Sequence, residues 1–134
     1  FITTWLGEID SEAGTLTYFS AGQAPLLHYQ AKTGSLLSLP ADTYPMGIME
    51  EMEISANRID MLPGDIFAVI SDGIFEANNT KREKMGEARI RALIQEASNL
   101  SAKEILDRIQ NATEEFTGHR PPEDDRTILI VKRI

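Results

Sequence analysis

The first two thirds of the chain alternate between short apolar stretches and residues that form turns. The apolar stretches show the alternation, or the β-branched and aromatic content, of strands. Predicted strands occupy residues 1–10, 15–22, 25–30, 35–39, 53–61 and 66–70. The last of these is apolar at every position, which is typical of a buried strand.

The hydrophobic period changes after Asn79. Residues 83–98 carry apolar side chains at the spacing of one helix face, and Ser101 with Glu104 has the spacing of a capping box at the start of a second helix, which extends to residue 116. A polar loop with two prolines follows, and residues 127–134 form a β-branched final strand. The side chains expected to be buried against the sheet are Ile90, Leu93, Ile94, Ile105, Leu106 and Ile109.

This order of strands, two helices and a last strand predicts an α+β fold, with helices packed on one face of a largely antiparallel sheet. The 134 residues suit one domain, residues 1–134. Phe1 and Trp5 are expected in its core. Because the chain opens on Phe1 instead of Met, already in strand-like sequence, we interpret it as a piece of a longer polypeptide.

Composition excludes several classes of site and partner. Without cysteine there are no disulfides and no thiolate metal sites, which is compatible with a cytoplasmic location. The net charge of −8 argues against nucleic acid, and no apolar run approaches the roughly 18 residues of a membrane span. The acidity reflects either solubility alone or carboxylates that converge on cations, and composition by itself favours solubility.

Two groups of carboxylates lie at the ends of predicted core strands. Asp72 follows the apolar run, with Gly73 behind it to permit a sharp turn, and Asp124 and Asp125 precede the final strand. If these two strands are neighbours, the acids can meet and offer the oxygen ligands that Mg²⁺ and Mn²⁺ prefer. Capping and turn roles are commoner for aspartate, so spacing alone leaves both interpretations open.

An ordered set of short motifs adds to this pattern. The stretches "LTYFSAGQAPLLHY", "PMGI", "LPGDIFAVISDGIFEANN", "MGEARIRALI", "SAKEIL" and "DDRTILIVK" span essentially the whole chain. Together they resemble the stage II sporulation E (SpoIIE)-like branch of the metal-dependent (PPM) serine/threonine phosphatases. The resemblance implies a β-sandwich flanked by helices, a site for two Mn²⁺ or Mg²⁺ ions, and removal of phosphate from Ser or Thr. It further implies a phosphorylated anti-anti-sigma factor as substrate, and a sensor or receiver domain upstream.

The resemblance also implies roles for individual residues. Asp72 and Asp124 fall at metal-ligand positions of the family, and Gly73 and Asp125 have supporting roles. Gln23 stands where the family usually has His, and the next residue, Ala24, where it has Pro.

One family feature has no counterpart in the sequence. The bridging Asp of the family lies in an earlier Gly-Asp segment, and Gly64-Asp65 lies instead in a turn before a plain apolar strand. We therefore expect that the N-terminal part of the domain is missing, that this chain alone is catalytically silent, and that it self-associates, for example as a homodimer. Two alternatives to a phosphatase remain: a non-catalytic regulatory or interaction module on the same fold, and a metal-free α+β domain.

Overall fold

The structure, a computed structural model, describes all 134 residues and contains seven strands and three helices. The strands are β1 (Thr4–Asp10), β2 (Thr15–Ala21), β3 (Leu26–Gln30), β4 (Ser35–Leu39), β5 (Asn57–Asp60), β6 (Ile66–Ile70) and β7 (Ile128–Lys132). The helices are α1 (Asp72–Phe75), α2 (Gly86–Glu96) and α3 (Ala102–Phe116). Every strand and both long helices predicted from the sequence are present, and the α+β class is confirmed.

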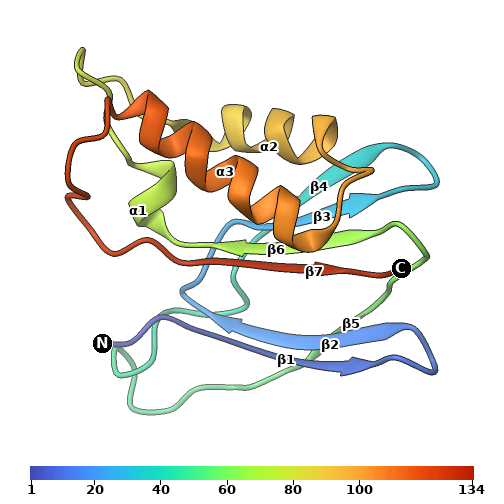
Figure 1. Ribbon diagram of the computed structural model, residues 1–134. Coiled ribbons are helices and arrows are strands. Elements are labelled where there is room, and N and C mark those ends of the chain that lie inside the picture. Colours follow the sequence, from blue (N-terminus) through green and yellow to red (C-terminus); the bar gives the residue numbers. More distant parts are fainter.

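The strands form two antiparallel sheets that are stacked as a sandwich. One sheet has the order β1-β2-β5 and the other β4-β3-β6-β7. All three helices lie on the outer face of the four-stranded sheet, so the molecule has three layers (Figure 1). This agrees with the β-sandwich flanked by helices that the resemblance implied.

Strand β6 lies at the centre of both hydrophobic cores. Ile66, Ala68 and Ile70 face the helices, and Phe67 and Val69 face the three-stranded sheet. Both faces of β6 are therefore covered, which explains why all five of its residues are apolar. Phe67 also packs against the ring of Tyr18 at a centroid distance of 5.3 Å.

Three expectations about local structure were wrong. Residues after the apolar run form the short helix α1 instead of only a turn. Phe1 is 88% exposed because it precedes β1 and has no element over it. Leu93 and Leu106 are half-buried, since they lie at the margins of helix faces whose centres are Ile94, Ile105 and Ile109.

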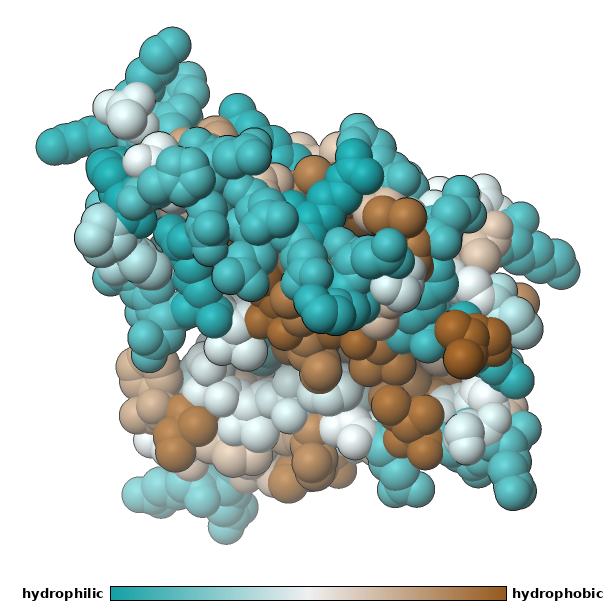
Figure 2. Space-filling view, viewed as in Figure 1, coloured by the Kyte–Doolittle hydropathy of each residue, from teal (hydrophilic) through white to brown (hydrophobic).

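Strands β1 and β7 are both at the edge of their sheets. Figure 2 looks onto this side of the molecule and shows hydrophobic patches between the polar helices and the lower sheet. Leu6, Ile9 and Leu129 are among the exposed large hydrophobic residues. Unpaired strand edges with exposed apolar side chains beside them favour association. Self-association of the chain therefore stays a prediction, which these two edges support. No helix in the structure has the length and apolar character to cross a membrane.

Candidate metal-binding site

The pairing of β6 with β7 brings the two candidate acidic segments to the same end of the four-stranded sheet. Ile70, the last residue of β6, lies opposite Ile128, the first residue of β7. Asp72 begins α1 directly after β6, and Asp124 and Asp125 lie in the loop that enters β7. The two strands are therefore neighbours, as the hypothesis of a shared site requires.

Gly73 allows the start of α1 to lie in direct contact with the backbone of the loop that enters β7. A Cβ atom at Gly73 would lie 2.1 Å from the carbonyl oxygen of Asp125 and 3.2 Å from that of Asp124. Any side chain there would collide with main-chain atoms that cannot rotate away. The supporting role expected for Gly73 thus has a physical reason, which is direct contact between the first turn of α1 and the Asp124–Asp125 backbone.

Ser71 links the two segments, and sequence reasoning missed it. Its hydroxyl donates to the carbonyl of Asp125 at 3.2 Å and accepts from the amide of Thr127 at 2.8 Å. Its own amide donates to the carbonyl of Thr127 at 3.0 Å. The sequence signal that could have identified Ser71 is its place as a hydroxyl residue between a buried strand and an Asp-Gly pair.

The carboxylates themselves are exposed at this end of the sheet. Those of Asp72 and Asp125 make no hydrogen bond or ion pair with the protein, and one oxygen of Asp124 accepts from the amide of Asp125 at 2.8 Å. Exposed carboxylate oxygens without protein partners suit a hard divalent cation. However, no group of three or more His, Cys, Asp or Glu side chains lies close enough together to hold a metal ion. The donors therefore fit part of a metal site.

Gln23 also supports the end of β6. Its side-chain amide donates to the carbonyl of Ile70 at 2.9 Å, two residues before Asp72. The backbone around Gln23 is fixed in turn, because the hydroxyl of Ser20 donates to the Gln23 carbonyl. Gln at the position where the family usually has His thus still forms a bond that holds the strand end.

Both carboxylate oxygens of Asp42, which lies next to Ser20, accept hydrogen bonds. Asp42 accepts from the amide of Ser20 at 2.7 Å and from the side chain of Asn57 at 2.5 Å. Burial, and to a lesser extent the charge of Asp42, raises the pKa of Tyr18, which lies on β2 with Ser20.

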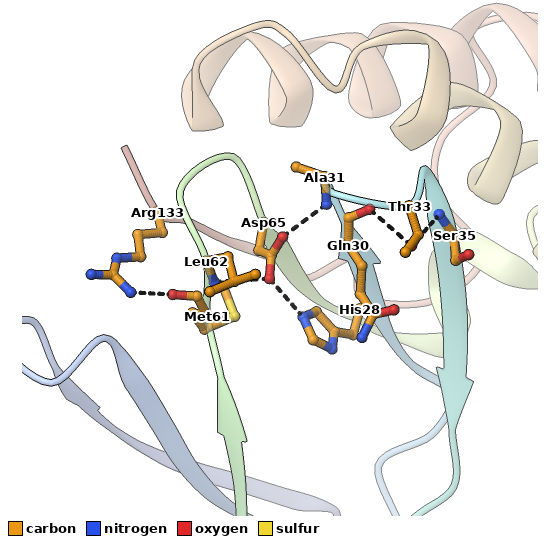
Figure 3. Close-up of polar contacts among 9 residues, drawn as sticks. All are labelled: His28, Gln30, Ala31, Thr33, Ser35, Met61, Leu62, Asp65 and Arg133. Atoms are coloured by element: carbon orange, nitrogen blue, oxygen red, sulfur yellow. Dashed lines mark hydrogen bonds and ion pairs between the residues drawn. The ribbon is translucent and has the colours of Figure 1, made fainter.

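Asp65 lies at the other end of β6 and has a different environment (Figure 3). It is 2% exposed, and its carboxylate accepts from the amides of Ala31 and Leu62 at 2.8 and 2.9 Å. The ring of His28 lies 3.6 Å away. Asp65 joins two turns of the scaffold, which agrees with its rejection as the bridging ligand.

Comparison with known proteins decides the family. The sequence model of "Stage II sporulation protein E (SpoIIE)" matches residues 1–134, which is the entire chain. The chain belongs to the SpoIIE family. Among curated proteins, Protein IcfG of Synechocystis sp. is 29% identical over 137 residues, which cover 99% of this chain and 21% of IcfG.

Solved structures show the fold of this SpoIIE-family chain. The SiaA-PP2C domain of Pseudomonas aeruginosa superimposes with a TM-score of 0.81 at 19% identity, over 97% of this chain and 51% of that one. The phosphatase domain of SpoIIE from Bacillus subtilis, in a manganese-presoaked form, gives 0.72 at 20% identity, over 98% and 56%. The chain therefore spans about half the length of these solved phosphatase domains.

Proposed function

We propose that this chain supplies Asp72 and Asp124 as metal ligands to a phosphoprotein phosphatase of the SpoIIE type. The observation that carries the proposal is the contact of Gly73 with the backbone of Asp124 and Asp125, because it brings two acidic segments, 52 residues apart in sequence, to one point. The manganese-presoaked SpoIIE domain from Bacillus subtilis supports Mn²⁺, or the similar Mg²⁺, as the ion. Asp125 has a supporting role beside them.

The chemistry of such a site follows from its charges. Two divalent ions, when bound, would neutralise phosphate charge and activate a water molecule. This chain's contribution is to hold carboxylate oxygens at the end of a rigid sheet, fixed by Gly73, Ser71 and Gln23. We propose a phosphorylated Ser or Thr in a cytoplasmic anti-anti-sigma-type protein as substrate, controlled by a sensor or receiver domain.

A second candidate function is a non-catalytic regulatory or interaction module on the same fold. The observation that favours it is the absence of any group of three potential ligands in the structure. For the same reason we expect the 134-residue chain alone to show no turnover of p-nitrophenyl phosphate with Mn²⁺.

The decisive experiment uses a polypeptide that spans the full length of the related phosphatase domains and contains this segment. Asp72→Asn and Asp124→Asn should each abolish Mn²⁺-dependent release of phosphate from a phosphoserine protein, with the circular dichroism spectrum unchanged. Asp60→Asn is the matched control, because Asp60 is an exposed strand carboxylate outside the site. Full turnover by Asp72→Asn at limiting Mn²⁺ would disprove the assignment, and Mn²⁺ binding without turnover by the unmodified polypeptide would favour the non-catalytic module.

A further inference from the structure

A polar pocket adjoins Asp124. It has a volume of about 340 Å³, and only one of its eleven lining residues is hydrophobic. It lies between α1, the loop after α1 and the loop that leads from α3 to β7. Three of the residues that line it are basic, Lys84, Arg120 and Arg126, and three are acidic, Glu76, Glu123 and Asp124.

The basic residues of the pocket differ in how their charge is compensated. Lys84 is neutralised, since its ammonium lies 2.7 Å from a carboxylate oxygen of Glu76. Arg120 donates only to the main-chain carbonyls of Thr117 and Asn78, at 3.0 and 2.6 Å. These bonds fix the direction of the Arg120 guanidinium, and they leave its positive charge without a carboxylate partner.

Arg126 forms no ion pair, although Glu123 and Asp124 line the same pocket. Its Nε atom is buried and has no hydrogen-bond partner, and its side chain also lines a second pocket beside α3. Buried donors are nearly always bonded in folded proteins, so an orphaned one calls for an explanation. A guanidinium carries five donors in a fixed plane, and that plane fits two oxygens of one anion. The guanidinium of Arg126, which forms no hydrogen bond within the chain, is therefore suited to an oxyanion in the pocket.

We propose that Arg126, assisted by Arg120, binds a phosphate group next to Asp124. The proposal rests on the phosphatase function proposed above and adds where the phosphate of substrate or product lies. Arg120 and Arg126 form no ion pair, and a guanidinium binds a phosphate monoester or inorganic phosphate through bidentate hydrogen bonds. The phosphate would then lie between the carboxylates that would hold the metal ions and the two arginines.

The test is an NMR titration of the 134-residue chain at pH 8 with a chelator present, which removes metal from the measurement. The two probes are inorganic phosphate and a short phosphoserine peptide, with the unphosphorylated peptide and chloride at equal ionic strength as blanks. Both phosphorylated probes should shift the Nε–H signal of Arg126 and the amide signals of Asn78 and Arg120. Tighter binding of the peptide identifies the substrate as the source of the phosphate, and equal binding identifies the phosphate group alone.

Variants separate a specific site from general electrostatics. Arg126→Ala should raise the half-saturating phosphate concentration about tenfold, as expected for one lost charge-assisted bond. Arg126→Lys, which keeps the charge and the stem, should weaken binding less and covers the case in which the alanine variant does not fold. The control is Arg108→Ala, because Arg108 is an α3 arginine paired with Glu96, outside the pocket.

Three outcomes would overturn the proposal. These are no shift of the Arg126 signal with either probe, equal weakening by Arg108→Ala and Arg126→Ala, and equal shifts with chloride. Failure of the phosphate-binding proposal can also be distinguished from failure of the phosphatase proposal. Phosphate binding is measured here without metal, and Asp72→Asn, which removes a nearby negative charge, should not weaken it even where it abolishes hydrolysis in the longer polypeptide.

Discussion

Strand β6 has an aspartate next to a glycine at each end, and the two aspartates have opposite environments. Asp65 is buried, and two backbone amides bond its carboxylate. Asp72, roughly 20 Å further along the chain by strand geometry, is exposed and has no protein partner. A carboxylate that the protein satisfies is part of the scaffold, and one left without partners is available to a ligand. The hydrogen bonds of each residue, more than its neighbours in sequence, therefore indicate its role.

The largest effect on stability is expected at the buried end. Asp65→Ala removes the acceptor of two partly buried hydrogen bonds, from the amides of Ala31 and Leu62, and a hydrogen bond to a charged group contributes about 1.5–3 kcal/mol. The loss in the free energy of unfolding should be about 2–5 kcal/mol in a urea melt, whereas Asp72→Asn should stay within about 0.5 kcal/mol. Similar losses for the two variants would show that Asp72 is also structural.

The sequence predicted the scaffold well because its signals are local. Period-two and helical patterns located every strand and both long helices, and the capping box at Ser101 and Glu104 forms as expected. The helix α1 was missed because four residues are too few to show a period. Phe1 was misplaced because burial of a terminal residue depends on what lies over it, which no local pattern encodes.

The candidate site was predictable only in part. Asp72, Gly73, Asp124 and Asp125 are signalled by their places at strand ends, and the family resemblance supplied their roles. Ser71 was not assigned to the site, because its contacts span 54 or more residues. Arg126 flanks the acidic pair, so the sequence allows it either a phosphate contact or a solvated or ion-paired role, and its unpartnered Nε is visible only in the structure. Such features depend on tertiary structure and leave no spacing in the sequence.

The two glycines offer the next test of the comparison. Gly64 has φ of +91°, and a Cβ there would lie 2.8 Å from that of Ala31, so Gly64→Ala strains the turn that holds Asp65. Gly73→Ala instead forces α1 away from the backbone of Asp125. Each should cost about 1–3 kcal/mol in a urea melt.

The position of the disturbance distinguishes these two variants. In an amide NMR spectrum, Gly73→Ala should shift the signals of Asp125 and Thr127, and Gly64→Ala those of Ala31 and Arg133, whose amides and carbonyls bond this turn. Disturbance of Asp125 by Gly64→Ala would mean that the two ends of β6 are coupled and that the comparison fails.

A smaller effect is expected from the support of the exposed end. Gln23→Ala removes the bond to the carbonyl of Ile70 and should lower stability by about 0.5–1.5 kcal/mol. Gln95→Ala is the control, because its side chain also donates to a carbonyl, that of Gly34, but at 3.4 Å and on the surface. Hydrogen exchange should rise at Asp72 and Gly73 in Gln23→Ala alone. An unchanged exchange rate there would remove Gln23 from the supports of the site.

The smallest effect is expected at Glu104, a carboxylate that is exposed like Asp72 but hydrogen-bonded like Asp65. Bonds from the side chain and then the backbone of Ser101 lower the pKa of Glu104 below 4.5. Because the folded-state pKa is lowered, the stabilisation is present above the unfolded-state pKa and is lost as pH falls through the folded-state value. Wild type should therefore exceed Glu104→Gln in unfolding free energy at pH 7, and the difference should shrink as the pH falls below the unfolded-state pKa and through the folded-state pKa. A pH-independent difference for Glu104→Gln would mean that solvent exposure cancels the effect of these bonds. The number of hydrogen bonds could then no longer serve to distinguish a structural carboxylate such as Asp65 from a free one such as Asp72.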